Sequence, residues 1–558
     1  MKNLSAYAHN RKRTPQNAPI PGSTQVPNSA GGFAWAVDDW VRLDRFLILG
    51  AEGGTYYIQE QPLTRENAAA VRRCIAADGA RAVARIVAIS TAGRAPKNDP
   101  AIFALALCAA EGDDATKRAA FAALPQVCRT GTHLFHFAEF VDGLRGWGRG
   151  LRQAVAGWYA MPAEKLAYQA IKYQQRDGWT HRDLLRLAHP KPAEDQHLAL
   201  YHWMVKGWDW VGEAPHPDPA LLPVWAFERA KRATSAAEIV RLIADYRLPR
   251  EAIPTAWLDD VAVWAALLPH MPLEAMLRNL ATMTRLGLVA PLSDGTRHVV
   301  AELRNADRLR AARLHPVKVL AALKTYASGR GVRGRHSWAP VAPVVDALDA
   351  AFYTAFGNVR PTGRRWILAL DVSGSMGGNM IAGVPGLDAR TGSAAMALIT
   401  AATEAQHTIV GFSAAAHGTG GRWGGGEPGL TPIAISPRQR LDDVVATVTR
   451  IPMGGTDCAL PMIWARRAQI AADVFVVYTD SETWAGKIHP VQALADYRDA
   501  LGIPARLIVV GMTSNGFSIA APDDAGMLDV VGFDPAVPTV MADFVTQGAG
   551  ARPSAVDE

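Results

Sequence analysis

A short apolar run that ends in regularly spaced oxygen-bearing side chains is the feature that most constrains the fold. Residues 366–370 predict a buried strand, and Asp371, Ser373 and Ser375 follow it at alternate positions. Gly374 lets the backbone turn tightly enough for both hydroxyls to face one point. Such hard oxygen ligands are preferred by Mg²⁺ and Mn²⁺. Because α/β proteins place ligand sites at the carboxyl ends of their strands, this stretch predicts a cation site in an α/β domain.

Two distant segments complete the predicted site. Residues 454–457 (Gly-Gly-Thr-Asp) offer a hydroxyl in a glycine turn, and residues 474–480 predict a second buried strand that ends in a carboxylate. We therefore expect one divalent cation, with Mg²⁺ as the leading candidate, held by Asp371, Ser373, Ser375, Thr456 and Asp480. In the alternative interpretation, the two serines only cap the next helix and Asp480 is a turn residue.

Strand and helix patterns alternate after residue 360. Apolar runs predict strands at residues 366–370, 408–412, 474–478, 507–510 and 528–531. Between them, helical patterns occupy residues 392–405, 442–449, 460–471 and 490–500. This order predicts a doubly wound α/β domain over residues 361–545. The glycine-rich residues 418–429 are expected to form a surface loop, and residues 546–558 a flexible tail.

The first 360 residues have a different pattern. Residues 1–30 predict an irregular lead-in, and amphipathic helices follow one another from residue 66 to residue 355. We expect no strand before residue 360. Many short helices with short connections indicate an α-solenoid of the HEAT type, although the sequence shows no fixed repeat period. The predicted fold class is therefore mainly α, with an α/β domain at the carboxyl end.

Charge is distributed unevenly between the two regions. Residues 361–558 carry 13 Lys and Arg against 19 Asp and Glu, which leaves 45 and 33 in residues 1–360, a net charge of +12. Such asymmetry favours a nucleic-acid partner for the first region. The alternative is a solvated basic surface without a partner.

The remaining composition excludes several classes of protein. The four cysteines are too few and too scattered for a disulfide framework or a zinc site. No apolar run is long enough to span a bilayer, and the first residues lack the apolar core of a signal peptide. We therefore expect a cytoplasmic protein without a membrane partner.

A basic stretch stands out in the helical region. We expect Lys172 and Arg176, four residues apart, to share one face of a helix that ends near Gly178. Thr180 and Asp183 form a capping-box pattern for a second helix. Its cations are four residues apart as well, and its end precedes a proline; these residues are Arg182, Arg186 and His189. Two cationic helix faces at one turn would bind phosphates.

Aromatic residues accompany this basic stretch. Tyr173 and Trp179 could stack on unpaired bases. Spacing alone favours Trp179 as a packing anchor, and a capping or core role for His189 taken singly.

Several stretches resemble the Ro autoantigen family, the ring-shaped TROVE-domain RNA-binding proteins. They are spread over nearly the whole chain and comprise Asn3-Leu-Ser-Ala-Tyr, residues 103–108, 131–135, Trp147-Gly-Arg149, residues 172–192, 314–317, 455–461 and 478–486. The resemblance implies a closed TROVE ring over residues 1–360, followed by a von Willebrand factor A domain. Its metal-ion-dependent adhesion site would be the cation site described above.

The resemblance also implies RNA partners. Family members bind small Y RNAs on the outer surface, and single-stranded ends of misfolded RNAs enter the central hole. Residues of the Y RNA site match here as Lys172, Arg176 and His189, and Arg149 lies in a matching stretch. The vertebrate motif tends to have a further lysine where this chain has Gln174. Bacterial relatives, which the composition suits, work with a 3′-to-5′ exoribonuclease and a Y-like RNA.

The resulting hypothesis is a non-enzymatic RNA-binding scaffold in noncoding-RNA quality control. We expect basic segments to line the hole, among them residues 94–97, Lys117-Arg118, residues 145–152, Arg330, Arg333 and Arg335. The first alternative is a metal-dependent adhesion module that binds a protein carboxylate and has no role with RNA. The second is a nuclease using Asp371 and Asp480, which a single cation held largely by hydroxyls disfavours. The sequence contains neither a phosphate-cradling loop nor an acyl-transfer constellation.

Overall fold

The computed structural model covers the whole chain and describes most of it. The described residues are 13–50, 63–207, 215–378, 387–413, 429–531 and 537–546, without residues 66–67, 96, 216, 313, 315, 332–335, 356–360, 437–438 and 513–515. The glycine-rich loop expected at residues 418–429 lies almost entirely outside this set. Of the expected tail at 546–558, only residue 546 falls within it.

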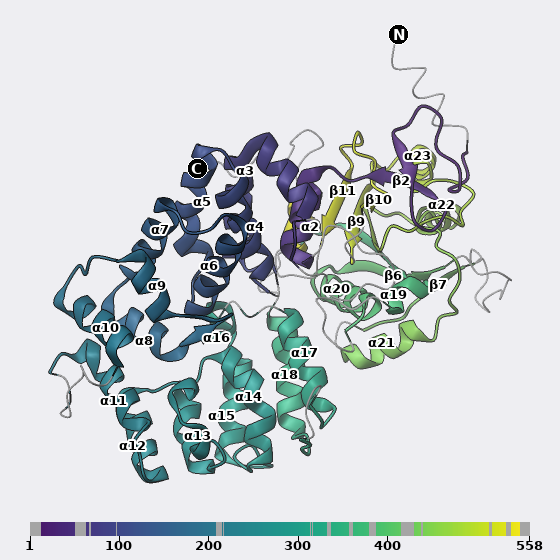
Figure 1. Cartoon of the computed structure of the whole chain (residues 1–558). Coiled ribbons are helices and arrows are strands. Elements are labelled where there is room, and N and C mark those ends of the chain that lie inside the picture. Colours follow the sequence, from purple (N-terminus) through teal and green to yellow (C-terminus); the bar gives the residue numbers. More distant parts are fainter. Residues whose placement is uncertain are drawn as a thin grey trace.

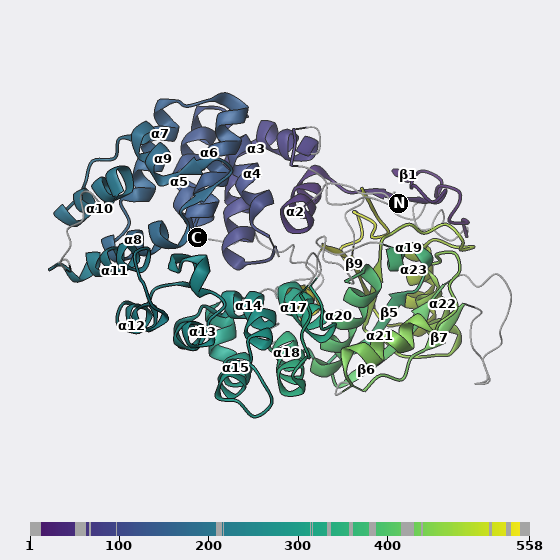
Figure 2. The same ribbon diagram turned by 60° about the horizontal axis from the view of Figure 1, so that its bottom comes forward.

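Helices make up most of the described first region and follow one another along an arc (Figures 1 and 2). The first part of the arc contains α2 (Asp39–Leu49), α3 (Ala69–Ala92), α4 (Asp99–Glu111), α5 (Asp114–Val127), α6 (Gly131–Arg145), α7 (Arg149–Tyr159), α8 (Ala163–Lys172), α9 (His181–Ala188) and α10 (Asp195–Lys206). The second part contains α11 (Leu222–Ala230), α12 (Ala236–Tyr246), α13 (Val261–Leu267), α14 (Leu273–Arg285), α15 (Asp294–Arg304), α16 (Ala306–Ala311), α17 (Pro316–Ala327) and α18 (Ala342–Thr354). Short 3-10 turns η3 (Pro219–Leu221), η4 (Arg250–Ala252), η5 (Thr255–Trp257) and η6 (Leu268–His270) connect some of them.

Each helix packs mainly on helices close to it in the sequence. The pairs α3 and α4, α4 and α6, α11 and α12, and α17 and α18 are examples. Their apolar faces form one continuous core, in which Phe103, Phe135, Trp264 and Phe352 are at most 3% exposed. This arrangement matches the predicted stacking of helices as a solenoid.

The second region is a six-stranded sheet with helices on both faces. Its strands are β5 (Arg365–Asp371), β6 (Gln406–Phe412), β7 (Leu430–Pro432), β8 (Val474–Thr479), β9 (Arg506–Gly511) and β11 (Met527–Val531). The strand order is β11-β9-β8-β5-β6-β7, and all neighbours are parallel except β6 and β7. The helices are α19 (Gly374–Gly378), α20 (Ala389–Thr403), α21 (Leu441–Thr449), α22 (Leu460–Arg467), α23 (Pro490–Leu501) and α24 (Val537–Thr546). The predicted doubly wound domain is therefore confirmed.

Alternate residues of the central strands face different helices. Leu368 and Leu370 belong to the core that contains α20, α21 and α24, whereas Ile367 and Ala369 belong to the core that contains α22 and α23. This alternation follows from the two-residue period of a strand. Because both faces are covered, the strand residues are apolar throughout, and β5 and β8 meet in the middle of the sheet.

The amino-terminal segment corrects one expectation, because it contains strands. β1 (Gln25–Pro27) and β2 (Phe33–Ala36) form an antiparallel pair, and β2 also pairs with β10 (Phe517–Ser518). The predicted irregular lead-in is thus ordered from residue 13 onward and lies against the α/β domain. Its apolar residues Ile20 and Trp35 are buried in that domain's core, which stabilises the pairing.

Both ends of the helical arc contact the α/β domain. At the first end, the buried guanidinium of Arg45 on α2 pairs with Asp529 on β11 at 3.0 Å and donates to the carbonyl of Phe517 at 3.2 Å. At the other end, Arg440 pairs with Asp346 on α18 at 2.8 Å. The domain thereby spans the two ends of the arc. Among the described helices, none combines the length and apolarity required to cross a membrane.

Candidate metal site and nucleic-acid surface

Asp371 is the centre of the predicted metal site, and the structure buries it completely at the end of β5. One carboxylate oxygen accepts from the hydroxyl of Thr479, on the neighbouring β8, at 2.7 Å. The other accepts from the backbone N–H of Ser373 at 2.9 Å. These two bonds fix the carboxylate at the carboxyl edge of the sheet.

The serine hydroxyls and Asp480 complete a compact group. The Oγ atoms of Ser373 and Ser375 lie 3.0 Å apart where α19 begins. Ser375 also hydrogen-bonds the carboxylate of Asp480, which is 3% exposed and follows β8 directly. The structure thus brings together four of the five predicted ligands from two adjacent parallel strands.

The electrostatics of this group favour a bound cation. Burial, followed by the negative charge of Asp480, raises the pKa of Asp371 from 3.8 to about 7. Burial also raises the pKa of Asp480, against the effect of its bond from Ser375. Two buried carboxylates that disfavour each other's charge become stable together when a divalent cation lies between them.

Thr456, the fifth predicted ligand, lies in the loop next to this group. It is 3% exposed, and its carbonyl accepts from the N–H groups of Trp484 and Ala485, both at 3.1 Å. Within the described chain, no residue hydrogen-bonds its side-chain hydroxyl. The described residues contain no group of three or more His, Cys, Asp and Glu, because three of the predicted ligands are hydroxyls. This all-oxygen donor set fits Mg²⁺ better than Zn²⁺.

Gln16 is a residue of this site that the sequence did not reveal. It is fully buried, and its amide nitrogen donates to the carboxylate of Asp457 at 2.7 Å and to the carbonyl of Ile488 at 2.8 Å. Its amide oxygen accepts from the hydroxyl of Thr483 and the N–H of Gly486. Gln16 therefore ties the loop of Thr456 to the loop that follows Asp480. A glutamine in an irregular segment carries no local signal for such a role.

The basic stretch folds differently from the prediction. Helix α8 ends at Lys172, and Arg176 lies in a two-stranded hairpin formed by β3 (Gln175–Arg176) and β4 (Trp179–Thr180). Lys172 and Arg176 therefore do not share a helix face. The turn residues Asp177 and Gly178 have φ angles of 51° and 81°, as a two-residue hairpin turn requires.

The second predicted helix of the stretch is confirmed. Thr180 and Asp183 make both hydrogen bonds of a capping box at the start of α9, and His189 ends the helix in the left-handed conformation. Arg182, Arg186 and His189 are exposed. Among the described residues, none pairs with these three side chains. Asp183, the nearest acidic residue in sequence, uses its carboxylate in the cap.

Trp179 is a packing anchor, as its spacing indicated. Its ring lies 5.5 Å from the ring of Trp147, and its indole N–H donates to Glu139 at 2.7 Å. Because Trp147 directly precedes α7, this contact brings exposed Arg149 toward the start of α9. No described side chain pairs with Arg149. The structure therefore gathers Arg149 with the cations of α9.

Lys172 has separate surroundings on the other side of the hairpin. Its ammonium group lies 5.2 Å from the ring of Tyr168 and 5.5 Å from that of Tyr173, and it donates to the Tyr168 hydroxyl at 3.0 Å. Burial opposes the charge on Lys172, but Tyr168 and the charge of Glu251 outweigh it and raise its pKa. No described contact joins Lys172 to Arg182 or Arg186.

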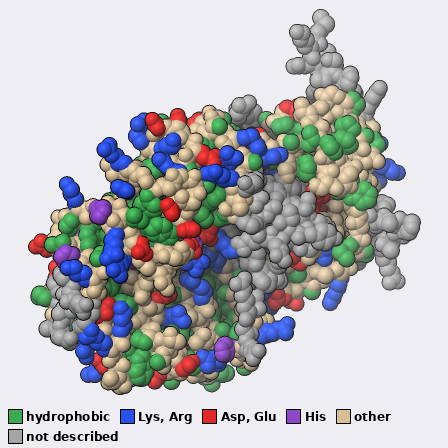
Figure 3. Space-filling model, viewed as in Figure 1, with side chains coloured by type: hydrophobic (Ala, Val, Ile, Leu, Met, Phe, Trp, Pro, Cys, Tyr) green, Lys and Arg blue, Asp and Glu red, His purple; other side chains and the backbone are tan. Residues whose placement is uncertain are grey.

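A hollow separates the two parts of the helical arc, with Lys and Arg side chains in and around it (Figure 3). Charges of both signs meet between α8, α14 and α17. Lys318 pairs with Glu274 at 3.1 Å, and both act on the pKa of His133, which burial lowers to about 3. Of the segments expected to line the hole, Arg333 and Arg335 lie outside the described residues. The guanidinium of Arg145 is bound to the carbonyl of Ala109 at 2.7 Å.

A helical-repeat arc joined to a doubly wound α/β domain, with serine and aspartate side chains at its strand ends, defines a two-part protein with a von Willebrand factor A module. Comparison with known families identifies both parts. The model of the TROVE domain matches residues 26–325, and that of the Ro60 vWA domain matches residues 365–545. The chain belongs to the Ro60 family of TROVE proteins.

Relatives match along almost the whole chain. An RNA-binding protein RO60 of Deinococcus radiodurans is 43% identical over 548 residues, which cover 98% of this chain and 99% of the relative. An RNA-binding protein RO60 of Caenorhabditis elegans is 36% identical over 612 residues, covering 96% and 92%. The crystal structure of the Deinococcus radiodurans RO (RSR) protein superposes with a TM-score of 0.69 at 42% identity and covers 91% of this chain and 99% of that one.

Proposed function

We propose that this protein is a non-enzymatic RNA-binding scaffold in noncoding-RNA quality control. The observation that carries the proposal is the group of exposed cations Arg149, Arg182, Arg186 and His189, for which the described chain offers no counter-charge. Exposed cations without partners gain most by neutralising phosphates, because binding releases the counterions of the nucleic acid. The names of the two relatives, both RNA-binding proteins, agree with this chemistry.

In this proposal, a Y-like RNA binds the outer surface. The α9 cations and Arg149 contact the phosphates of a structured region, and Arg176 extends the contact from the tip of the hairpin. Lys172 contributes a charge next to two tyrosine rings, where an unpaired base can stack. Phosphate contacts position the RNA and carry little sequence information.

A second RNA site lies in the hollow of the arc. We propose that it takes single-stranded ends of misfolded RNA, because a narrow passage admits a free strand and excludes a duplex. A bound end would be presented to a 3′-to-5′ exoribonuclease in the cytoplasm, and the nuclease would supply the hydrolysis that this chain lacks.

The metal site has a structural and adhesive role in this proposal. Asp371, Ser373, Ser375, Thr456 and Asp480 would hold Mg²⁺, which neutralises the two buried carboxylates and offers an open position to a partner's carboxylate. Ser375 orients Asp480, Thr479 orients Asp371, and Gln16 holds the surrounding loops.

One observation favours adhesion to a protein as a second function. Met453 and Trp484 are 64% and 44% exposed, although both are large and apolar. Trp484 lies against the loop of Thr456, and the sulfur of Met453 accepts from Arg390, which also donates to the carbonyl of Ser373. An apolar rim next to an open metal position suits an acidic protein segment.

Titration of a labelled Y-like hairpin RNA against the full-length protein tests the main proposal. We expect saturable binding that weakens steeply with salt, and that weakens further when Arg182→Gln and Arg186→Gln are combined. Binding that depends on neither salt nor these arginines would contradict the proposal. RNA that fails to bind while an acidic peptide binds in the presence of Mg²⁺ would favour the adhesion function.

A further inference from the structure

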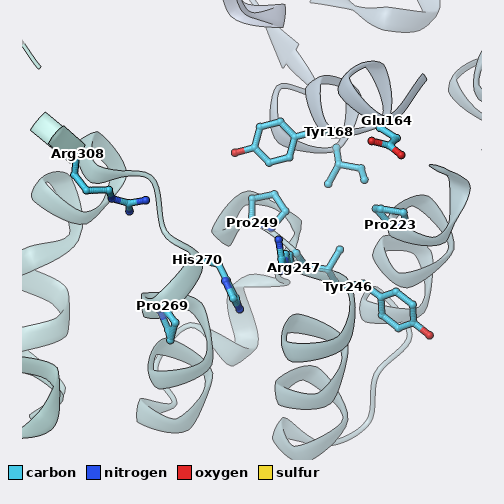
Figure 4. A pocket seen from close by; sticks show the side chains of 11 residues that line it. Glu164, Tyr168, Pro223, Tyr246, Arg247, Pro249, Pro269, His270 and Arg308 are labelled. Atoms are coloured by element: carbon cyan, nitrogen blue, oxygen red, sulfur yellow. The ribbon is translucent and has the colours of Figure 1, made fainter. Parts of the chain in front are cut away.

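A pocket of about 480 Å³ opens between α8, α11, α12, η6 and α16 (Figure 4). Its volume lies within the range of about 300–1,000 Å³ that is usual for small-molecule sites. The polar and aromatic residues that line it are Glu164, Tyr168, Tyr246, Arg247, His270 and Arg308. They come from five elements that are distant in sequence, so the pocket exists only in the folded arc.

Three cations gather in one part of this pocket. Arg308 and His270 lie on one side and Arg247 near the middle, whereas Glu164 lies on the opposite side (Figure 4). No described residue makes a hydrogen bond or an ion pair with the side chain of Arg247 or His270. Arg308 has one partner, Glu302, at 2.6 Å. This side of the pocket therefore holds positive charge that the described protein leaves largely unneutralised.

The backbone of Arg247 is held in an unusual conformation. Arg247 ends α12 with φ 52° and ψ 41°, the left-handed region that glycine or asparagine adopts more readily. Such strain in a non-glycine residue is concentrated at functional sites, where the surrounding structure maintains it. Here the strained residue is the one whose guanidinium lies in the middle of the pocket.

The aromatic wall links the pocket to the proposed RNA surface. Tyr168 lines the pocket, and its hydroxyl accepts the hydrogen bond from Lys172. A ligand stacked on Tyr168 would therefore lie next to a residue of the proposed Y RNA site. Carboxylates such as Glu164 accept hydrogen bonds from sugar hydroxyls, as acidic residues do in dinucleotide sites.

We infer that this pocket binds a single nucleotide: its base against Tyr168, its phosphate at Arg247, His270 and Arg308, and its ribose hydroxyls toward Glu164. The nucleotide is either an unpaired residue of an RNA held at Lys172 or a free mononucleotide. The first source rests on the proposed function, and the second does not.

Calorimetric titration of the full-length protein with AMP tests the inference. We expect saturable binding, and binding weaker by about tenfold or more for adenosine, which lacks the phosphate, since hydrogen bonds to charged groups contribute about 1.5–3 kcal/mol. Arg247→Asn removes the guanidinium and tolerates the left-handed backbone, so we expect a similar loss without unfolding. His270→Gln is a second variant with the same expected direction. Arg241→Gln, an exposed arginine on α12 that does not line the pocket, is the matched control.

The outcomes separate this inference from the proposed function. Absence of saturable AMP binding, or equal affinity of the wild type and Arg247→Asn, overturns the inference even if hairpin RNA still binds. AMP binding together with failure of hairpin RNA to bind supports the pocket and removes the proposed function. Competition between AMP and a single-stranded pentanucleotide with a 5′-phosphate identifies RNA as the source, and AMP binding without competition identifies a free mononucleotide.

Discussion

The side-chain amide of Gln16 donates to the carboxylate of Asp457 at 2.7 Å, although 441 residues separate the two in the sequence. Asp457 directly follows the proposed ligand Thr456, and the other partners of Gln16 lie in the loop after Asp480. The amino-terminal segment therefore holds together two loops of the candidate metal site. The site depends on both ends of the chain.

Gln16→Ala should destabilise the protein and loosen this site. The substitution leaves several buried polar groups unpaired, each at a cost of about 1–3 kcal/mol, so we expect a loss of about 3 kcal/mol in the free energy of unfolding. Denaturant unfolding with and without Mg²⁺ measures the effect. Gln153→Ala, on the exposed side of α7, is the control. Equal stability of the two variants would show that the Gln16 contacts are unimportant.

Mg²⁺ should stabilise the wild-type protein more at pH 8 than at pH 5. Without metal, the folded state holds a proton on Asp371 up to about pH 7, whereas the unfolded state loses it near pH 3.8. The folded state thus binds more protons between these values, so the metal-free protein loses roughly 2–4 kcal/mol of stability as pH rises through this interval. Mg²⁺ competes with that proton, so its effect grows as pH rises.

Thermal unfolding across this pH range, with and without Mg²⁺, checks the prediction. Asp371→Asn is uncharged at every pH and should be stable without metal, with little response to Mg²⁺ or to pH in this interval. A wild-type response to Mg²⁺ that is the same at pH 5 and pH 8, or that persists in Asp371→Asn, would argue against the site.

Lys172→Ala combined with Arg176→Ala should weaken binding of structured RNA and leave the protein folded. The salt dependence should also flatten, by about 0.9 in the logarithmic slope for each lost phosphate contact on a duplex. Filter binding at several salt concentrations measures both quantities. Lys487→Ala with Arg450→Ala removes the same charge from exposed positions of the α/β domain and serves as the control. An unchanged affinity and slope would rule out the assignment of these two residues.

A single-stranded 3′ tail should increase the affinity of a hairpin RNA for the protein. The tail adds phosphate contacts in the hollow of the arc, and this contribution should be strongly salt-dependent. The comparison uses one hairpin with and without its tail, and a circular RNA of the same sequence. End-threading is refuted if the circular RNA binds as tightly as the tailed hairpin.

The turn in the basic stretch shows how a local signal was misjudged. Asp-Gly between two short extended segments is a strong hairpin signal, because both turn residues need positive φ. The four-residue spacing of Lys172 and Arg176 instead indicated a helix. Both residues keep their proposed role, but they project from different elements and cannot act as one helix face.

The sequence by itself determined the α/β domain, the helical arc and the ends of strands β5 and β8. These features follow from apolar periodicity and from the edge at which parallel strands end, and both are visible over a few residues. Tertiary structure alone decided that Gln16 supports the metal loops, that Arg45 joins α2 to β11, and that the cations of the nucleotide pocket converge. Such contacts join segments far apart in the chain, and each residue satisfies its hydrogen bonds or charge through a partner that no local pattern specifies.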